Sequence, residues 1–570
     1  MTLRNRIRAA AGEHPCDLLL TNGRVVNVFS GRVVDTDVAV AEGRVVGFGP
    51  RQAREIMDLG GRYLCPGFID AHLHIESAMV GPAEFARAVL PRGTTAVVAD
   101  PHEIANVLGT DGIDYMLAAS AGLPLRFFFT LPSCVPASPM ETSGAILAAG
   151  DLKPYMEHPA VVGLAEMMNF PGVVAGDPDV LGKIRMAHSA GKPVDGHAPG
   201  LSGQALHAYL CAGIGTDHEC TGVDEAMEKL EAGMRILIRE GSGARNLEAL
   251  LQAVTEKTAH RVMWCTDDRH PHDLMAEGHM DGVVRKAVRK GLDPLLAIRM
   301  ATLNPAEAYG IRDAGAIAPG RRADLVVFSD LASIEVEMVL SAGRPVARSG
   351  RLEDSIAFPP PPPCRSSMNV DPRHVEWSIP AAGSRARVIG IVPDQIVTRG
   401  LILPVRVDNG RAVADTGRDI VKLMVIERHT GDSGHAAGFV SGLGLTAGAI
   451  ASSVAHDSHN LIVAGVNDAD MATAARVVAE MGGGLAAVAE GRVMATLPLP
   501  VAGLMSDRSV QSVRGDLDNL IRAAGALGSR LSDPFITLSF LALPVIPDLK
   551  LTDKGLVDVN RFEIVDLFVP

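Results

Sequence analysis

The sequence predicts an α/β fold, in which a TIM-like (β/α)8 barrel is inserted in a small β-sandwich and followed by a C-terminal α+β domain. Three observations lead to this prediction. Eight apolar strand candidates alternate with helix-compatible stretches between residues 66 and 310, which matches the repeat number and length of such a barrel. Short β-type runs flank this region on both sides. Five consecutive prolines then separate it from a region rich in glycine and alanine.

The composition indicates a globular protein with no nucleic-acid or membrane partner. The 570 residues include 53 Lys and Arg against 66 Asp and Glu, which gives a formal net charge of −13. Contacts to a phosphate backbone depend on basic side chains, so this charge argues against nucleic acid. The longest apolar stretch, residues 535–547, is broken by Pro544 and is shorter than the ~18 residues that a bilayer-spanning helix needs.

The cysteines and the first residues of the chain bear on its location. The seven cysteines form no C-x-x-C pair, which argues against a disulfide framework and against a cysteine zinc ribbon. The N-terminal sequence reaches Glu13, His14 and Asp17 before any apolar run, so it does not resemble a secretory signal. We therefore expect a cytoplasmic protein with reduced thiols.

Residues 1–65 and 311–357 are predicted to form one composite β-sandwich domain. Residues 17–64 contain short β-type runs separated by Asn-Gly and Glu-Gly turns, which are typical of hairpins. The same pattern of strand, turn and strand returns at 316–328 and 336–350. One β-domain assembled from both flanks of an inserted domain explains this arrangement.

Residues 66–310 are predicted to form the barrel. Its strand candidates are PGFIDAH, TTAVVAD, LRFFFT, VVGLAE, PVDGHA, GIGTDH, MRILIRE and RVMWCTDD. In this architecture the residues that end the strands gather at one rim. The candidates at this rim are His72, Asp100, Thr130, Glu166, His197, His218, Glu240 and Asp267. Random strand ends would not be this rich in side chains that bind metals.

The five prolines belong to a predicted linker, residues 358–374, because polyproline is a stiff spacer between domains. Residues 375–570 are predicted to form a separate α+β domain. The cluster His456 to Asn460 lies in this domain between two apolar runs. The cluster is either a polar turn or a part of the domain that closes the pocket or forms subunit contacts.

Five of the strand-end residues, together with His74, form a candidate metal centre. His72 and His74 stand at i and i+2, so on a strand both imidazoles lie on the same face and can reach one cation. Further strand ends supply Glu166, His197, His218 and Asp267. The six side chains provide three to four ligands for each of two ions that share a bridging carboxylate. Asp268 is the alternative to Asp267, because strand alternation lets only one of them face the metal.

Seven sequence motifs, spread over essentially the whole chain, point to a known family. They are PGFIDAHLHIESAM, VVADPHEIANVLG, VVGLAEMMNFPGV, DGHAPGLSG, GTDHE, WCTDDRHPHDL and AHDSHNLIVAG. As a set they resemble the bacterial adenine deaminases of the amidohydrolase superfamily. The resemblance implies that the metal ligands are His72, His74, Glu166, His197, His218 and Asp267. Glu166 stands where many superfamily members carry a carboxylated lysine.

The resemblance also implies the cofactor and the reaction. The ligand types suit Zn, Fe or Mn about equally, and the resemblance favours Mn or Fe for activity. The implied reaction is the hydrolysis of adenine to hypoxanthine and ammonia, for purine salvage. A hydroxide bridging two divalent ions would attack C6, since a metal lowers the pKa of bound water toward 7. Asp267 is the expected proton shuttle to the departing ammonia.

Attack at C6 moves electron density to N1, so an acid must protonate N1. Glu103, in the segment Asp100-Pro101-His102-Glu103, is the candidate acid, because the preceding strand delivers this segment to the same rim. His102 is expected to orient the substrate or stabilise charge, and Asp100 is a further catalytic candidate. The alternative is structural, with Asp100 starting the following helix and Glu103 in its first turn.

Two other functions stay open. An N-acetylglucosamine-6-phosphate deacetylase has the same fold and also uses Glu, His, His and Asp, but its phosphate needs basic residues. Arg269 and His270 are the only obvious ones at the rim. A metal-free structural barrel, as in the collapsin-response relatives of the hydantoinases, would have lost ligands, whereas all six positions are filled here. Superfamily enzymes of this size are usually dimers or larger, so we expect a homodimer or a larger homo-oligomer.

Overall fold

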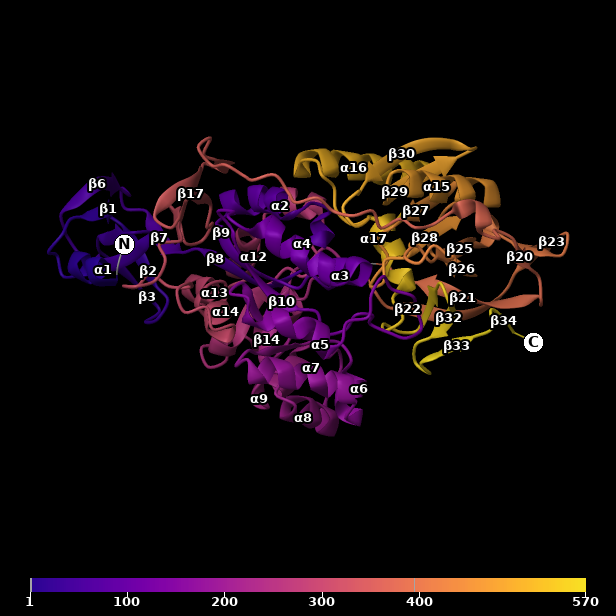
Figure 1. Ribbon diagram of the computed structural model, residues 1–570, viewed down its shortest axis with the longest axis horizontal. Coiled ribbons are helices and arrows are strands. Elements are labelled where there is room, and N and C mark those ends of the chain that lie inside the picture. Colours follow the sequence, from indigo (N-terminus) through magenta and orange to yellow (C-terminus); the bar gives the residue numbers. More distant parts are fainter. Residues whose placement is uncertain (1–2, 394, 570) are drawn as a thin grey trace.

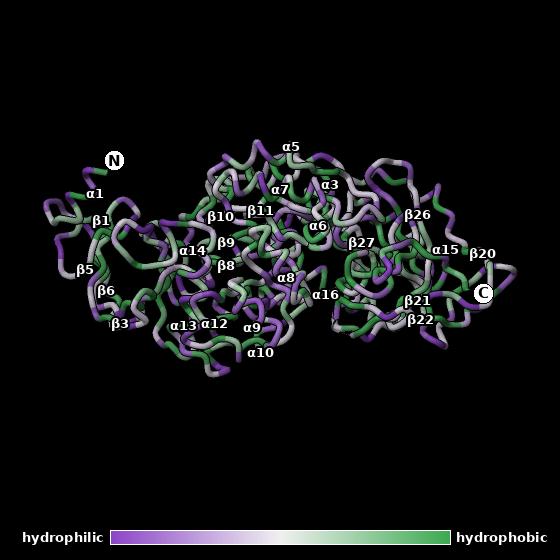
Figure 2. The backbone as a smooth tube through the Cα atoms, turned by 90° about the horizontal axis from the view of Figure 1, so that it is seen from below, coloured by the Kyte–Doolittle hydropathy of each residue, from purple (hydrophilic) through white to green (hydrophobic). Residues whose placement is uncertain are grey.

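Three β-rich regions follow one another along the chain, and they lie in a row along the long axis of the molecule (Figure 1). The computed structural model describes residues 3–393 and 395–569. The strands near the N-terminus lie at one end, the barrel in the middle and the C-terminal domain at the other end. Figure 2 shows the same order from a second direction and marks the hydrophobic stretches inside each region.

Two β-sheets form the region around the N-terminus, and both flanks of the barrel contribute to them. One sheet has the order β5-β4-β1-β6 and the other has the order β19-β18-β17-β16-β7-β2-β3. β7 pairs antiparallel with β16, so the N-terminal flank is joined to a strand that follows the barrel. Apolar residues of both sheets, including Leu20, Val40, Leu64 and Leu325, form one buried cluster. The predicted sandwich with an inserted barrel is confirmed.

The elements of this region begin with a short N-terminal helix. They are α1 Leu3–Ala10, β1 Cys16–Thr21, β2 Arg24–Asn27, β3 Arg32–Asp35, β4 Val38–Ala41, β5 Arg44–Phe48, β6 Ala53–Asp58, β7 Tyr63–Pro66, β16 Leu325–Phe328, β17 Val336–Ser341, β18 Arg344–Arg348 and β19 Arg351–Leu352. Glu42 and Gly43 both have positive φ angles, 54° and 72°, in the turn between β4 and β5. This pair of angles is typical of the tight turns that connect hairpin strands.

Eight strands form the barrel, and they are the eight that the sequence predicts. β8 to β12 form one parallel sheet and β13 to β15 form a second. Bridges from Val194 to Ile214 and from Leu73 to Asp267 connect the two sheets at both edges. Strands such as β8 and β9 are buried along their whole length, as expected where helices cover a parallel sheet. The strands are β8 Phe68–Leu73, β9 Thr94–Ala99, β10 Arg126–Leu131, β11 Val161–Met167, β12 Val194–Gly196, β13 Thr216–Asp217, β14 Arg235–Arg239 and β15 Val262–Cys265.

Helices follow the barrel strands and lie around them (Figure 1). Two of these helices begin with a proline behind an aspartate cap. Asp177 accepts hydrogen bonds from backbone amides at the start of α7, and Asp293 caps α13 in the same way. Such caps pair amides that have no partner inside the helix. The helices are α2 Pro82–Val89, α3 His102–Leu108, α4 Thr110–Ser120, α5 Ala149–Leu152, α6 Phe170–Ala175, α7 Pro178–Ser189, α8 Gly203–Cys211, α9 Val223–Glu231, α10 Leu247–Leu250, α11 Pro271–Ala276, α12 Met280–Arg289, α13 Pro294–Met300 and α14 Leu303–Ala308.

A nine-stranded sheet is the main element of the C-terminal domain, which has the predicted α+β class. The sheet has the order β22-β21-β26-β25-β28-β27-β29-β30, with β34 paired to β21. The helix α15 packs on β27, β28 and β29, and α16 packs on β29 and β30. Two small sheets, β20-β24-β23 and β31-β32-β33, complete the domain.

The bounds of these elements follow the chain from the end of the linker. The helices are α15 Asp468–Glu480, α16 Val510–Ala526, α17 Pro534–Ser539 and the single 3-10 turn η8 Phe540–Ala542. The strands are β20 Ile379–Pro380, β21 Arg385–Ile391, β22 Thr398–Pro404, β23 Arg406–Asp408, β24 Arg411–Val413, β25 Ile420–Ile426, β26 His435–Ser441, β27 Ala449–Ser452, β28 Leu461–Gly465, β29 Gly484–Ala489, β30 Arg492–Pro498, β31 Leu549–Thr552, β32 Gly555–Asp558, β33 Glu563–Val565 and β34 Phe568–Val569.

The C-terminal domain docks on the barrel through direct hydrogen bonds. Asn460 Nδ2 donates to the carbonyl of Thr142, in the loop after β10, at 2.8 Å. The Thr142 amide donates to Asp553 Oδ1 at 2.9 Å. A β-bridge between Val80 and Ser506 adds a second contact. Residues from the far end of the sequence therefore lie against loops that follow the barrel strands.

Three further findings concern the chain as a whole. The seven cysteines are unpaired. No helix within residues 3–393 and 395–569 is long and apolar enough to cross a membrane. The domain boundaries at residues 65, 310, 357 and 374 remain predictions.

The two shortest barrel strands, β12 and β13, are held by a buried ion pair. Lys229 of α9 is fully buried, and its Nζ donates to Asp217 Oδ2 at 2.9 Å and to the carbonyl of Ala198 at 2.7 Å. Asp217 Oδ1 accepts a hydrogen bond from the Ala198 amide at 2.8 Å. These contacts fix the chain next to His197 and His218, which directly follow the two strands.

We expect Lys229→Met to lower the free energy of unfolding by about 3–5 kcal/mol, because it leaves the buried Asp217 carboxylate without its cation. Urea unfolding followed by circular dichroism measures this loss. Lys290→Met is the control, since Lys290 pairs with Glu248 on the surface at 2.9 Å and exposed pairs contribute about 1 kcal/mol or less. Equal losses in the two variants would contradict the role of the buried pair.

Candidate metal centre and active site

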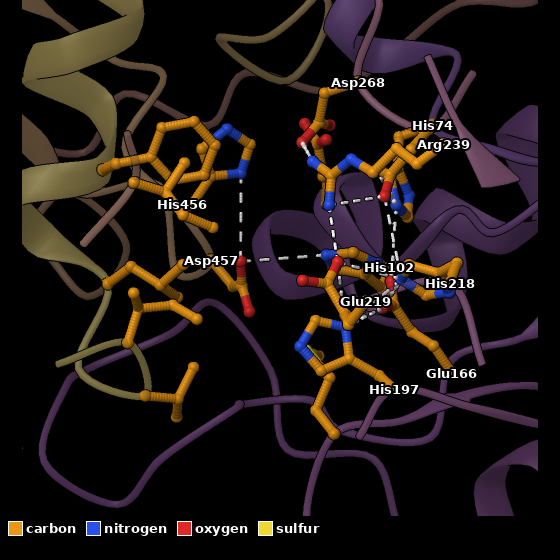
Figure 3. Close-up of a pocket in the computed structure, with 18 residues that line it drawn as sticks. His74, His102, Glu166, His197, His218, Glu219, Arg239, Asp268, His456 and Asp457 are labelled. Atoms are coloured by element: carbon orange, nitrogen blue, oxygen red, sulfur yellow. Dashed lines mark hydrogen bonds and ion pairs between the residues drawn. The ribbon is translucent and has the colours of Figure 1, made fainter. Parts of the chain in front are cut away.

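The six predicted metal ligands meet at the rim of the barrel, with Glu166 among the four histidines. Figure 3 labels His74, Glu166, His197 and His218 of this group. One of its carboxylate oxygens, Oε1, lies 3.3 Å from His74 Nε2 and 3.8 Å from His72 Nε2. The other oxygen, Oε2, lies 2.8 Å from His197 Nδ1 and 3.2 Å from His218 Nε2. Each oxygen faces a different pair of histidines, which is the arrangement of a carboxylate that can bridge two ions.

Asp267 adds the second carboxylate. Its Oδ1 lies 3.4 Å from His74 Nε2 and its Oδ2 lies 3.7 Å from His218 Nε2. Its φ angle of 55° is left-handed, so the chain leaves strand geometry directly after β15. Alternation therefore no longer separates Asp267 from Asp268, and Asp268 also lies near His74. Both aspartates therefore line the cavity, and the choice of Asp267 as the ligand stays a prediction.

The donor set fits divalent cations. Four imidazoles and two carboxylates offer nitrogen and oxygen ligands that suit Zn, Fe and Mn. His72 Nε2 is buried and has no hydrogen-bond partner among the residues that the structure describes, although buried polar atoms normally have one. A cation bound by this group would give His72 Nε2 its missing partner.

The protonation of the histidines indicates that the group requires positive charge. Burial alone would lower the pKa of His74, but hydrogen bonds to Asp267 and Glu166 raise it well above its ordinary value. Burial also opposes the charged form of His218, yet Glu166 and Asp267 raise the pKa of His218 to about 9. Divalent cations would supply this charge in place of the protons, because metal binding displaces protons from its ligands.

The segment from Asp100 to Glu103 lies beside the ligands, where α3 begins. The carbonyl oxygen of Asp100 lies 3.0 Å from His74 Nδ1 and accepts its proton, which directs His74 Nε2 to the carboxylates. The Asp100 side chain does not cap α3. Its Oδ2 lies instead 3.0 Å from His102 Nδ1. Asp100 and His102 therefore belong to the same buried group as His74 and Glu166.

Glu103 is buried in the first turn of α3 and contacts Ser77 and His459. Ser77 Oγ lies 3.0 Å from Glu103 Oε1 and 2.6 Å from Asp268 Oδ1. A hydroxyl has one proton, so both contacts are hydrogen bonds only when one of the carboxyls is protonated. The Ala455 amide donates to His459 Nδ1 at 3.2 Å, which leaves the ring proton on Nε2, 3.7 Å from Glu103 Oε2.

The electrostatics identify Glu103 as the carboxyl that retains its proton. Burial, followed by the nearby carboxyls of Glu76 and Asp268, raises the pKa of Glu103 well above its usual range. The pKa of Asp267 moves in the opposite direction, since Arg239 and His74 outweigh burial and hold it well below its usual range. Two carboxyls in one site thus have pKa values pushed apart, as an acid and a base require.

Arg239 and Glu219 were not predicted from the sequence. Arg239, at the end of β14, places NH1 2.5 Å from Glu219 Oε1 and 2.8 Å from Asp267 Oδ2. Its NH2 lies 3.3 Å from Asp268 Oδ2. Glu219 Oε1 also lies 3.4 Å from His218 Nε2. The arginine that directly follows the apolar run 236–238 was the available signal, because a buried arginine needs carboxylate partners.

Two of the predicted rim residues do not take part. The Glu240 carboxylate does not face the cavity. It accepts a hydrogen bond from the Leu247 amide at 3.0 Å and forms an ion pair with Lys286 at 2.8 Å. Thr130 is buried, and its hydroxyl has no hydrogen-bond partner among the described residues. Neither residue lines the cavity at the metal centre.

The cluster His456 to Asn460 lies in this cavity, between β27 and β28. His456 Nδ1 lies 3.8 Å from Asp457 Oδ1, and Asp457 Oδ1 lies 3.8 Å from His102 Nε2 (Figure 3). The imidazole of His456 stacks on the ring of Phe540, with centroids 4.6 Å apart. Residues 456–459 form a polar turn, as one alternative predicted, but the turn is buried and its residues His456 and Asp457 line the cavity.

The cavity has two chemically different sides. Charged and polar side chains line the barrel side. The C-terminal domain adds His456, Asp457 and an apolar wall that consists of Ile396, Phe540, Leu543, Val545 and Ile546. A planar ring with one polar edge and apolar faces is the kind of molecule that such a cavity can hold.

Known proteins match both regions that build the cavity. Residues 63–346 match the model of the amidohydrolase family, and residues 395–563 match that of the adenine deaminase C-terminal domain. A protein named adenine deaminase from Desulfatibacillum aliphaticivorans is 55% identical over 99% of both chains. One from Methanothrix thermoacetophila is 49% identical over 100% of both chains, and one from Nitratidesulfovibrio vulgaris is 49% identical over 100% of this chain and 99% of its own.

The chain belongs to the adenine deaminase family. Its barrel is an amidohydrolase domain, and enzymes of that family are metal-dependent hydrolases. Membership of the adenine deaminase family also accounts for the C-terminal domain, which the structure brings to the same cavity as the ligands.

We expect active protein to contain two divalent ions per chain, because the six donors exceed what one tetrahedral site uses. Elemental analysis measures the metal content. Glu166→Ala is expected to reduce it to one ion or less and to abolish activity, since each Glu166 oxygen faces a different histidine pair.

Glu240→Ala is the matched control for this prediction. Glu240 is a buried carboxylate at the end of another barrel strand, β14, but it pairs with Lys286 outside the cavity. The control is expected to keep two ions. Active wild-type protein with one ion or none would contradict the binuclear centre.

Proposed function

We propose that the protein catalyses the hydrolytic deamination of adenine to hypoxanthine and ammonia. The observation that carries this proposal is the likeness to proteins named adenine deaminase over the whole chain at about half identity. The cavity supports it, because a protonated carboxyl and an ionised carboxyl stand beside the candidate ligands. A spectroscopic assay of Mn-reconstituted protein with adenine, adenosine, guanine and cytosine tests the proposal directly.

The residues proposed to hold the metal are His72, His74, Glu166, His197, His218 and Asp267. When bound, divalent cations supply a water molecule that is deprotonated near neutral pH and can attack C6. We propose Mn or Fe as the active metals, with Zn as a third possibility that the donor set also admits.

Glu103 is proposed to protonate N1. Attack at C6 pushes electron density onto N1, and a buried carboxyl that retains its proton can donate to this atom. Ser77 Oγ lies 3.0 Å from one oxygen of Glu103 and holds it in place. His459 Nε2, from the C-terminal domain, lies 3.7 Å from the other oxygen, so both domains border the acid.

Asp267 is proposed to carry the second proton. Its low pKa keeps it ionised, so it can accept a proton from the attacking water and deliver it to the amino group that leaves as ammonia. Arg239 fixes Asp267 Oδ2 at 2.8 Å, which limits the carboxylate to the orientation that faces the centre.

His102 is proposed to orient the substrate and to stabilise charge. Burial opposes the charged form of His102, but the carboxylates of Asp100 and Asp457 outweigh it and raise the pKa of His102 well above its ordinary value. Asp100 is thus a partner of His102 and acts on the substrate through it. The His456 and Phe540 rings lie on the far side of Asp457 and place an aromatic surface at the cavity.

The structure gives no support to the deacetylase alternative. Arg269 donates to the carbonyl of Glu240 at 2.7 Å and pairs with Glu277 at 3.1 Å. His270 Nδ1 lies 3.2 Å from Asp533 Oδ2. Both basic groups are engaged by acidic partners, so neither is free to bind the phosphate of an amino-sugar substrate.

The cellular setting of the enzyme follows from the reaction and the composition. We propose that it serves purine salvage in the cytoplasm and forms a homodimer or a larger homo-oligomer. The chain carries a net charge of −13, which is unfavourable for binding nucleic acid.

We expect Glu103→Gln to lower kcat by about 10² to 10⁴-fold while two ions per chain remain, because glutamine cannot donate and recover a proton. Steady-state kinetics with metal analysis measures both quantities. Glu248→Gln is the control, since Glu248 is also the second residue of its helix but pairs with Lys290 on the surface. A loss below tenfold for Glu103→Gln would show that its role is structural.

We also expect free adenine to be turned over far better than adenosine. The side of the cavity away from the ligands is the apolar wall. Its side chains offer no hydrogen-bond partners for the ribose hydroxyls of adenosine. Burying a hydroxyl without a partner costs free energy. The ratio of kcat/KM for the two substrates is the measurement. Comparable values would refute this account of the wall.

A further inference from the structure

The apolar wall is a small hydrophobic cluster, separate from the main core of the C-terminal domain. Phe540, Leu543 and Ile546 form it, and Ile396 and Val545 pack against them. The wall comes from two irregular stretches, the loop before β22 and the segment from η8 to β31. Small clusters under loops have fewer packing partners than a main core, so other contacts must fix their position.

Lys550 supplies such contacts. It lies on β31, directly behind the wall, and is fully buried. Its Nζ donates to the carbonyl of Ile396 at 2.8 Å and to the carbonyl of Phe540 at 2.9 Å. One amine therefore joins the two stretches of chain that make up the wall.

The surroundings of Lys550 are unusual for a lysine. Within residues 3–393 and 395–569 it forms no ion pair with a carboxylate. Burial lowers the pKa of Lys550 to about 7, and Asp548 opposes this only in part. An apolar side chain would cost less to bury, so the lysine contributes through its two donated hydrogen bonds.

Phe540 connects Lys550 to the polar side of the cavity. Its carbonyl is held by Lys550, and its ring stacks on His456. The His456 amide donates to the carbonyl of Ser539 at 3.1 Å, next to Phe540 in the chain. The position of Phe540 therefore determines both the wall and the ring that stands beside Asp457.

We propose that Lys550 is a positioning residue for the substrate, which fixes the apolar wall and the His456 ring against which the purine lies. This inference rests on the proposed function, because it assigns the wall to the base. Lys550 does not touch the reacting atoms, and it acts through the carbonyls of Ile396 and Phe540.

The test compares Lys550→Met with Lys422→Met. Lys422 is a second buried lysine in the same domain, but it donates to Trp377 and pairs with Asp468 away from the cavity. Both substitutions remove a buried amine, so both are expected to lower the urea midpoint. Only Lys550→Met is expected to raise KM for adenine, by about tenfold or more, because small displacements of positioning groups are costly.

The split between kinetic constants distinguishes positioning from stability. In Lys550→Met, kcat is expected to change less than threefold and two ions are expected to remain, because the acid and the ligands are intact. An unchanged KM, or an equal rise of KM in Lys422→Met, would overturn the inference. Failure of the proposed function would appear differently, as wild-type protein that releases no ammonia from adenine.

A second variant covers the case in which Lys550→Met does not fold. The amide nitrogen of Lys550→Gln is one bond closer to the backbone and cannot span both carbonyls. It is expected to raise KM for adenine in the same direction, and a wild-type KM would overturn the inference.

Discussion

The contact between Glu166 and four histidines is the interaction on which the rest of the site depends. One carboxylate takes a histidine pair on each of its oxygens, so strands from opposite parts of the barrel must end at the same point. This requirement explains the buried support around the centre. Lys229 and Asp217 hold the chain beside two of the histidines, and Arg239 holds Asp267.

Charge balance also explains why the acid and the base can coexist a short distance apart. The barrel side of the cavity carries the carboxyls of Glu103, Glu166, Glu219, Asp267 and Asp268, with Arg239 as the one guanidinium among the described lining residues. The positive charge of Arg239 lies on one part of this group. Asp267, which is next to it, therefore ionises easily. Glu103 lies at the other part, against Glu76 and Asp268, where a second negative charge would be unfavourable.

The residues that could be identified from the sequence are those that a local sequence pattern reveals. The spacing of His72 and His74, and the polar ends of apolar strands, follow from the period of a β-strand and from the topology of a parallel barrel. The same reasoning predicted all eight strands. The alternation argument does not apply at Asp267, where a left-handed residue ends the strand geometry. The strand-end pattern also does not reveal that the Glu240 carboxylate turns to Lys286 of α12.

Contacts between distant parts of the chain left no local pattern. Arg239 looked like one of two arginines that flank a short apolar run, and only the folded barrel brings it to three carboxylates. His456 and Asp457 were visible as a polar cluster, but their place depends on how the C-terminal domain docks. Lys550 gave no signal at all, because its partners are backbone carbonyls, which every residue has.

The metal ligands and the acid lie on one side of the cavity, and the residues proposed to contact the base lie on the other. The two groups also come from different parts of the sequence. The ligands and the acid are encoded before residue 270, whereas the wall is encoded after residue 395. Substitutions in the later part can therefore reshape the space for the base while the reactive groups stay unchanged. Asp457 and His459 connect the two parts, because the later part of the chain places them beside His102 and Glu103.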